Sequence, residues 1–355
     1  MIELAGVSRS YGARPAVRAV DLRVAAGAFL CIVGPSGSGK STLLRLIAGL
    51  DEPTAGEIRI AGRTVAAAAS RRRVAPQHRS IGFVFQDFAL WPHMSVAAHV
   101  DWPLRLKGLP AAERAARVGE VLALNGLSPL AGRYPAELSG GERQRTAIAR
   151  ALAPGPDILL FDEPFSNLDV RIRGDLRRRI LDLHRASGTT SILVTHDQGE
   201  ALAMASDLAV LDGGRVHQAG PPDALLARPA TPFVAAFLGT PPGNLIPADV
   251  RDGRLWALGR PVAPARDVGH GGRLRLHYRP ERLSLGPADD PDGVGATVVE
   301  RLPAAGRWML RLDCAAGVAL QLIAEADCPA REGDRVTVRI PDHPDSVFAG
   351  QERLP

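Results

Sequence analysis

The sequence has few lysines and few cysteines. Of its 43 basic residues only Lys40 and Lys107 are lysines, so 43 − 2 = 41 are arginines, and the formal net charge is +5. The arginines are spread through the whole chain, so a clustered nucleic-acid-binding patch is not predicted. The three cysteines, Cys31, Cys314 and Cys328, are widely spaced. They offer neither a metal-ligand spacing nor a disulfide framework, which favours a reducing compartment.

Long apolar runs are also missing. No window of 18 apolar residues occurs, which excludes a transmembrane helix, and no basic stretch followed by an apolar one opens the chain as a secretory signal would. Apolar residues make up 46% and charged residues 23% of the 355 residues, as in folded globular proteins of about two domains. The sequence predicts a soluble intracellular protein, whose membrane role must run through a partner.

The first two thirds of the sequence predict an α/β domain. A buried-strand run at 29–33 is followed by a glycine-rich loop and an apolar helical run. Residues 66–80, with an alanine tract and three consecutive arginines, are expected to form a solvated loop or short helix. Residues 95–153 have helical spacing, and buried strands follow at 158–161 and 191–194. Strands alternating with helices predict a parallel sheet with crossover helices.

The composition changes near residue 240. Residues 240–243 read Thr-Pro-Pro-Gly, which is typical of a linker. Short alternating strands separated by turns are predicted beyond it, for example at 273–278, 308–312 and 335–340. This pattern is typical of a small β-barrel or sandwich. The predicted organisation is an α/β domain at 1–239 followed by an all-β domain at 240–355.

A phosphate-binding loop is predicted between the first strand and its helix. Residues Gly34 to Thr42 match the pattern G-x-x-x-x-G-K-[ST]. Glycines let successive backbone N–H groups converge on phosphate oxygens, and the helix N-terminus adds its positive dipole end. In this pattern Lys40 reaches the β- and γ-phosphates and Ser41 is a ligand of Mg²⁺. One of only two lysines falls here, which favours a nucleotide site over a chance glycine turn.

Two acidic residues end the strand at 158–161. Buried carboxylates at the carboxyl end of a strand are costly unless they serve a cation or a reaction. Asp162 is therefore predicted to join the Mg²⁺ shell, and Glu163 to orient and deprotonate an attacking water. An acidic turn after a strand would be unremarkable alone, but the phosphate loop makes the catalytic interpretation the stronger one.

A third motif makes the interpretation specific. Residues Leu138 to Gln144 read Leu-Ser-Gly-Gly-Glu-Arg-Gln and precede a helical run at 145–152. In isolation this is an ordinary Ser/Gly helix cap. Beside the other two motifs, it resembles the signature motif of ATP-binding-cassette (ABC) ATPases. The resemblance implies a P-loop NTPase with a RecA-like core and a helical subdomain at about 87–155, followed by an OB-like C-terminal domain.

The other positions of the cassette occur in the family's order. Tyr11 is similar to the aromatic residue that stacks on adenine, and Gln86 to the Q-loop glutamine that contacts Mg²⁺ and water. Ser166 to Asp169 resembles the D-loop, and His196 resembles the switch histidine that contacts the γ-phosphate.

The predicted site has three overlapping groups of residues. The catalytic residues are Glu163, His196, Gln86 and Lys40. The Mg²⁺ ligands are Ser41, Gln86 and Asp162. The residues predicted to bind ATP are Tyr11, Gly34, Pro35, Ser36, Gly37, Ser38, Gly39, Lys40, Ser41, Thr42, Ser139, Gly140, Gly141, Gln144 and Asp169.

The resemblance also implies partners. Two copies would pack head to tail, so that Ser139 and Gly141 of one complete the γ-phosphate site of the other. Because only one cassette is present and both half-sites are intact, a homodimer is expected. Residues 87–94 resemble the stretch that receives a helix of a membrane permease in bacterial importers, although Trp91 and Met94 could instead be core residues. The expected location is the cytoplasmic face of the bacterial inner membrane, with an extracytoplasmic binding protein as an indirect partner.

The end of the chain resembles importers of sugars, polyamines, ferric iron, sulfate, molybdate and phosphonates. The residues that carry this resemblance are at 212–221, 233–239, 244–247 and 279–281. Ferric iron, a polyamine or a sulfate- or phosphonate-type anion is predicted as cargo, with sugar disfavoured because the tail is short. The tail itself could serve dimerisation, regulation or anion binding. The alternative function is an ABC ATPase acting on DNA or ribosomes, which typically has two cassettes or a coiled-coil insertion, and neither is found.

Overall fold

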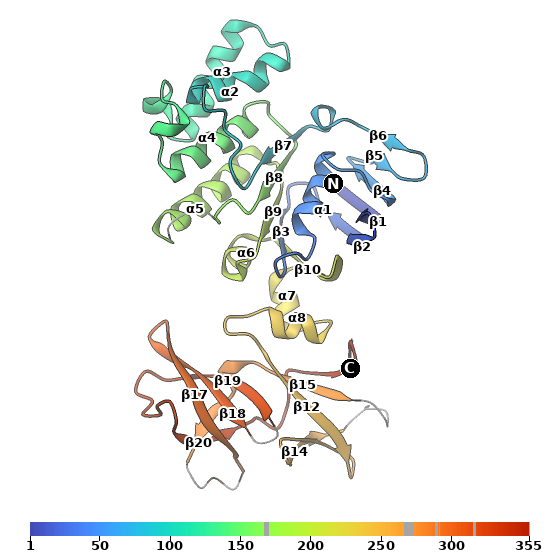
Figure 1. Ribbon diagram of the computed structural model, residues 1–355, viewed down its shortest axis with the longest axis vertical. Helices are drawn as coiled ribbons and strands as arrows, with labels where there is room; N and C mark the ends of the chain where they lie inside the picture. Colours follow the sequence, from blue (N-terminus) through green and yellow to red (C-terminus); the bar gives the residue numbers. More distant parts are fainter. Residues whose placement is uncertain (167–169, 266–272, 288–289, 291, 315–316, 355) are drawn as a thin grey trace. The chain divides into compact units, whose positions relative to one another are not determined.

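The computed structural model (Figure 1) forms two compact units, Met1–Pro222 and Asp223–Pro355. It describes residues 1–166, 170–265, 273–287, 290, 292–314 and 317–354. The predicted domain boundary after residue 239 stays a prediction. None of the helices in these described ranges combines the length and the apolar composition that crossing a membrane requires.

A six-stranded sheet forms the centre of the first unit (Figure 1). Its strands, in spatial order, are β11 (Arg215–Gly220), β10 (Asp207–Asp212), β3 (Phe29–Val33), β9 (Thr190–Thr195), β8 (Ile158–Asp162) and β7 (Ile81–Val84). The five strands from β10 to β7 are parallel, and β11 is antiparallel to β10. β3 and β9 are buried along their whole length, as expected for strands that are covered on both faces.

A second, antiparallel sheet packs beside the central one. Its strands, in spatial order, are β2 (Arg14–Val24), β1 (Ile2–Tyr11), β4 (Ala55–Ile60), β5 (Arg63–Ala67) and β6 (Arg72–Arg73). Apolar residues of both sheets and of helix α1 (Lys40–Ala48) form one core. The central sheet also packs against α4 (Gly140–Leu152) and α6 (Gln198–Met204), and α5 (Val170–Ser187) connects β8 to β9. The helix that follows the glycine-rich loop is therefore held from both sides.

Three α-helices lie between β7 and β8 in the sequence. They are α2 (Val96–Leu106), α3 (Ala111–Leu124) and α4, with short 3-10 turns at Ser128–Leu130 and Pro135–Glu137. Val96, Val100 and Leu104 repeat at helical spacing on α2 and are buried in a separate small core with residues of α3 and α4. Ser95 caps α2 by accepting a hydrogen bond from the Ala98 N–H at 3.3 Å. The prediction of a helical region at 95–153 is confirmed.

The second unit contains two antiparallel sheets over one core. The first sheet has β14 (Arg260–Pro264), β13 (Arg254–Ala257), β12 (Asn244–Arg251), β15 (Leu274–Tyr278), β21 (Ser346–Ala349) and β22 (Glu352–Arg353). The second has β16 (Ser284–Gly286), β20 (Arg335–Arg339), β17 (Val294–Ala304), β18 (Arg307–Cys314) and β19 (Val318–Ala324). Helices α7 (Pro222–Ala227) and α8 (Pro232–Phe237) precede the strands of both sheets. A 3-10 turn at Pro280–Arg282 lies between β15 and β16. The predicted fold class, a P-loop α/β domain followed by a β-rich tail, is confirmed.

Residue Arg79 departs from the expectation for its segment. The segment 66–80 was expected to be solvated, yet Arg79 is buried. Its Nη1 donates to the carbonyl oxygens of Leu46 and Ile47 at 3.0 and 2.8 Å, and burial lowers its pKa to about 10. The last carbonyls of a helix have no partner within the helix, so a guanidinium can satisfy them. Arg79 thus caps α1, the helix that begins at Lys40.

His277 is a buried titratable residue in the second unit, on β15. Neither ring nitrogen has a hydrogen-bond partner among the described residues. Burial lowers its pKa to about 4; Arg279 and Arg353 act in the same direction, and Asp345 opposes them. Because an unfolded histidine titrates near 6.5, the unfolded chain binds this proton more tightly. We expect the stability from neutral His277 to be fully present above about pH 6.5 and lost toward pH 4, at a cost of about 3 kcal/mol.

Replacement of His277 by Phe tests this expectation. The free energy of unfolding of His277→Phe should depend less steeply on pH between 4 and 6.5 than that of the parent chain. His343, an exposed histidine of the same unit, supplies the control, because His343→Gln should keep the parent slope. Equal slopes for the parent and His277→Phe would show that the burial of this ring does not govern acid stability.

Candidate functional site

The parallel strands bring the predicted site residues to one edge of the central sheet. Strands β3, β9, β8 and β7 are consecutive neighbours, and in register Val33 pairs with Thr195 and Asp162 with Val194. The segments that follow their carboxyl ends therefore lie side by side. They are the glycine-rich loop after β3, His196 after β9, Glu163 after β8 and Gln86 after β7. In open α/β sheets this edge is where ligands bind.

The loop after β3 requires glycine for steric reasons. Gly37 and Gly39 have φ of +79° and +101°, in the region that side chains disfavour. A Cβ at Gly34 would lie 1.9 Å from the Leu211 carbonyl oxygen, and one at Gly39 would lie 2.3 Å from that of Ala16. The loop thus packs closely against neighbouring backbone, which fixes its conformation. Within it Ser36 is exposed and Ser38 is buried, while the Ser38 N–H donates to the Pro35 carbonyl at 3.2 Å.

Lys40 is the first residue of α1 and is only 5% exposed. Its Nζ donates to the carbonyl oxygens of Gly34 and Pro35, both at 2.9 Å, so the ammonium lies over the loop. Burial lowers its pKa, while the Glu163 and Asp162 carboxylates oppose that shift. A buried ammonium at a helix N-terminus attracts an anion, which agrees with the predicted phosphate contact.

Ser41 and Asp162 face each other. The Ser41 hydroxyl donates to Asp162 Oδ1 at 2.7 Å. Burial raises the pKa of Asp162, and the hydrogen bond from Ser41 opposes this. Mg²⁺ prefers oxygen ligands and is usually held by one or two carboxylates together with substrate phosphates and water. A hydroxyl, a carboxylate and the exposed Gln86 on the neighbouring strand end fit that donor set.

Glu163 and His196 form a pair beside this group. His196 Nδ1 lies 3.2 Å from Glu163 Oε2, and the Glu163 N–H donates to the Val194 carbonyl at 3.0 Å. Glu163 has a φ of +44°, a left-handed conformation that is unusual for a residue with a Cβ. Such backbone persists only where neighbours over-determine it, and it is common at functional sites. The carboxylate is one-fifth exposed, so water can reach it.

Asp51 and Arg9 hold the Tyr11 side chain in place, with the Arg9 guanidinium over the ring. Its hydroxyl donates to Asp51, the Arg9 guanidinium lies 4.7 Å from the ring centroid, and Arg9 pairs with Asp51 at 2.8 Å. Tyr11 is 47% exposed, so the ring remains available for stacking on a base.

The signature segment begins helix α4. Ser139 is its N-cap: the Ser139 N–H donates to Glu142 Oε2 at 2.7 Å, and the Ser139 hydroxyl accepts from the Glu142 N–H at 3.4 Å. The hydrogen bonds from the backbone and the hydroxyl of Ser139 lower the pKa of Glu142. Ser139 is exposed, and Gly140 and Gly141 form the first turn. Figure 1 shows α4 beside α2 and α3 and apart from α1, so within one chain this segment does not close over the loop at Lys40.

Gln144 requires a correction. It was predicted to bind the nucleotide, but it is fully buried and its amide donates to the Pro164 carbonyl. A side chain without exposed surface has no atom accessible to a nucleotide, so in this chain Gln144 lies in the protein interior. Asp169, the remaining predicted contact, lies outside the described residues.

Sequence reasoning missed a set of hydrogen bonds around the switch histidine. The Thr195 hydroxyl donates to Glu200 Oε2 at 2.8 Å and accepts from the Asp197 N–H at 3.0 Å. The Glu200 N–H in turn donates to Asp197 Oδ1 at 3.0 Å. These bonds fix both neighbours of His196. The available signal was the acid three residues after a helix-capping Asp.

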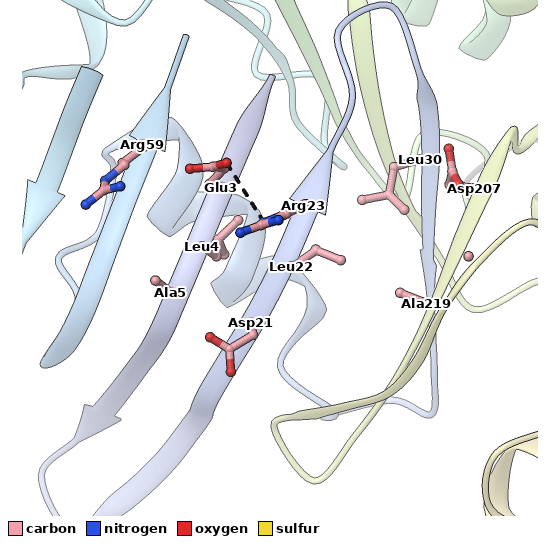
Figure 2. Close-up of a pocket in the computed structure, with 11 residues that line it drawn as sticks. Glu3, Leu4, Ala5, Asp21, Leu22, Arg23, Leu30, Arg59, Asp207 and Ala219 are labelled. Atoms are coloured by element: carbon pink, nitrogen blue, oxygen red, sulfur yellow. Dashed lines mark ion pairs between the residues drawn. The ribbon is translucent and has the colours of Figure 1, made fainter. Parts of the chain in front are cut away.

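A separate cavity of about 650 Å³ lies between the two sheets of the first unit (Figure 2). Its walls carry charges of both signs, and Glu3 pairs with Arg23 at 3.9 Å. It contains none of the predicted site residues. The chemistry of the chain is therefore assigned to the carboxyl edge of the central sheet.

Comparison with known proteins agrees with this geometry. A family model described as ABC transporter matches residues 17–166. The sequence is 45% identical over 301 residues to the sn-glycerol-3-phosphate import ATP-binding protein UgpC 1 of Rhizobium johnstonii, covering 83% of this chain and 80% of that protein. It is 42% identical over 345 residues to the UgpC of Chromohalobacter salexigens, covering 96% and 92%.

Solved structures give the same result for the fold. An ATP-binding cassette solved as a dimer in a post-hydrolysis state, with ADP and Pi bound, has a TM-score of 0.55 at 34% identity, covering 62% of this chain and 98% of that one. CbiO1 from Clostridium perfringens, part of the ABC transporter complex CbiONQ, has a TM-score of 0.57 at 26% identity, covering 64% and 90%.

The relatives correct one prediction. Both are named for import of sn-glycerol-3-phosphate, which is none of the predicted cargoes: ferric iron, a polyamine, or a sulfate- or phosphonate-type anion. Tail length disfavoured only a sugar, and the length of a tail gives no information about contacts with a cargo. Neither name supports an action on DNA or ribosomes. The chain belongs to the family of ABC transporter ATP-binding proteins, in the group of importer ATPases that use ATP and Mg²⁺.

Proposed function

We propose that this chain hydrolyses ATP to drive the import of sn-glycerol-3-phosphate, or of a closely similar organic phosphate, through a membrane permease. One juxtaposition carries the catalytic part of the proposal: Ser41 with Asp162, and Glu163 with His196, at the mouth of the loop that holds Lys40. The cargo part is supported by relatives of that name, which align with almost the whole chain.

In the proposed reaction a water molecule attacks the γ-phosphorus of ATP. Glu163 accepts a proton from this water as the new P–O bond forms, and the bond to the β-phosphate oxygen breaks to release ADP. Lys40 and the loop N–H groups stabilise the negative charge on the phosphate oxygens. His196, held beside Glu163 at 3.2 Å, contacts the γ-phosphate. When bound, Mg²⁺ neutralises phosphate charge, and Ser41, Asp162 and Gln86 are the residues that would hold it.

A second copy of the chain completes the proposed site. The N-terminus of α4 begins with Gly140 and Gly141, whose N–H groups have no carbonyl partner within the helix and suit an anion, but it lies apart from α1 in the same chain. A head-to-tail pair would place this helix end over the γ-phosphate bound by the other copy. ATP would close the pair and hydrolysis would open it.

The docking surface for the permease is proposed around Trp91. Trp91 and Trp102 are 41% and 40% exposed and meet edge to face, with ring centroids 6.4 Å apart. Trp91 stacks on buried His99, which accepts a hydrogen bond from the Trp91 N–H at 2.8 Å. Trp91 is thus displayed on a rigid base rather than packed in the core, as suits a groove for a permease helix. Contact with a permease would place the chain at the cytoplasmic face of the inner membrane.

A membrane pull-down with the Glu163→Gln variant tests the transport assignment. ATP should trap this variant in the closed pair, so a tagged copy should retain a polytopic membrane protein through detergent extraction. The control is Trp91→Ala in the same background, which should lose the membrane protein and still bind ATP. Recovery of ribosomal proteins or DNA without a membrane protein would refute the assignment.

Uptake measurements test the cargo. Vesicles that contain the recovered permease and its binding protein should accumulate labelled sn-glycerol-3-phosphate when ATP is supplied with the parent chain. Maltose and spermidine, which represent cargo classes without a phosphate, should not enter. ATP-driven uptake of either compound in place of the phosphate ester would refute the cargo while leaving the ATPase assignment intact.

A further inference from the structure

Gln144 connects the signature helix to the turn that holds Glu163. It lies on α4, and its side chain is 0% exposed. Its Nε2 donates to the carbonyl oxygen of Pro164, the residue directly after Glu163. The buried side-chain amide of Gln144 thus hydrogen-bonds to a backbone carbonyl beside the proposed catalytic base.

The turn after Glu163 needs such a support. Glu163 adopts a left-handed φ of +44°, which a residue with a Cβ adopts only when its surroundings impose it. The Ser166 N–H and hydroxyl donate to the Glu163 carbonyl at 3.3 and 3.0 Å, and the Glu163 N–H donates to Val194. None of these hydrogen bonds involves the Pro164 carbonyl. Gln144, which lies outside the turn, donates to it.

The amide oxygen of Gln144 indicates that packing does not explain why a glutamine occupies this position. Gln144 Oε1 is buried and has no hydrogen-bond partner in the part of the chain that the structure describes. An unsatisfied buried oxygen is costly, and a methionine of similar volume would avoid that cost. The hydrogen bond to Pro164 is therefore the feature that distinguishes glutamine from an apolar residue here.

We propose that Gln144 is a positioning residue for Glu163, acting through the Pro164 carbonyl to hold the carboxylate in place for the attacking water. This inference rests on the proposed role of Glu163 as the base. Because Ser139 caps α4, the same hydrogen bond joins the base to the helix proposed to contact the other copy's nucleotide.

Gln144→Met is the primary test, in the full chain and in a double-mutant cycle with Glu163→Gln. We expect kcat to fall about 10-fold with KM for ATP unchanged, because only the aim of the base is altered. In the Glu163→Gln background, Gln144→Met should cause no further loss of turnover and no change in ATP affinity. The control is Thr146→Val on the same helix, because the buried Thr146 hydroxyl donates within α4, to the Glu142 carbonyl at 2.8 Å.

Gln144→Glu provides a second readout that does not depend on how well the methionine variant folds. A protonated carboxyl can donate to the Pro164 carbonyl and an ionised one cannot. Its kcat relative to the parent should therefore fall as the pH rises, whereas the Thr146→Val ratio should stay flat.

Three outcomes would overturn the inference: a normal kcat in Gln144→Met, an increase in KM alone, or an equal additional loss in the Glu163→Gln background. Failure of the proposed function is seen separately, because Glu163→Gln alone would then keep its turnover.

Discussion

Glu163→Gln is expected to lower ATP turnover by about 10²- to 10⁴-fold, the range that a positioned general base contributes. The amide cannot accept the proton of the attacking water, yet it keeps the size of the side chain and can still hydrogen-bond to His196. ATP affinity should therefore remain within about twofold of the parent value. Steady-state hydrolysis and equilibrium binding of a fluorescent ATP analogue measure the two quantities.

The matched control is Glu120→Gln, on the surface of α3. Glu120 pairs with Arg117 at 2.8 Å and lies outside the site, so its loss should change neither quantity. Turnover of Glu163→Gln near the parent rate would remove Glu163 from the role of base. It would leave His196, at the next strand end, as the group to test.

Lys40→Met is expected to reduce both ATP affinity and turnover, the latter by about 10²- to 10³-fold, as for loss of one preorganised donor at developing charge. The methionine fills a similar space but lacks the ammonium that lies over the loop, 2.9 Å from the Gly34 and Pro35 carbonyls. Because the ammonium contacts bound and reacting phosphates, affinity should fall too, unlike in Glu163→Gln. The contrast between the two variants separates binding from base catalysis.

The sequence offers an unusually direct control for this variant. Lys107 is the only other lysine, and its Nζ donates to the Pro154 carbonyl at the surface. Lys107→Met should keep parent affinity and turnover in the same assays. If Lys40→Met binds ATP as tightly as Lys107→Met does, the loop is not the phosphate site.

The elements that sequence patterns predicted well are those fixed by local physics. The buried-strand run at 29–33 corresponds to β3, Phe29–Val33, because a short apolar run bounded by glycine turns is typical of a strand covered on both faces. The glycine-rich loop could be recognised because backbone in this conformation, pressed against Leu211 and Ala16, excludes a Cβ.

Other assignments could not be made from local patterns. Arg79, in a segment rich in arginine and alanine, is buried because four carbonyl oxygens of α1 and its surroundings converge on it. Gln144 sits in a motif associated with the nucleotide, yet in the folded chain its side chain points inward and donates to the Pro164 carbonyl, in the turn after β8. Neither the motifs nor the length of the tail predicted the cargo for which the relatives are named.

By itself, the sequence determined that this chain has a phosphate loop, a strand ending in two acids and a signature helix, because each needs particular residue types at fixed spacing. The tertiary structure alone decided which of these groups meet. Parallel pairing of β3, β9, β8 and β7 places Ser41 on Asp162 and His196 on Glu163. The physical reason is that spacing along a chain sets local backbone geometry. Contacts between residues 121 positions apart, as for Ser41 and Asp162, or 33 apart, as for Glu163 and His196, depend instead on the register of strands and the packing of the helices between them.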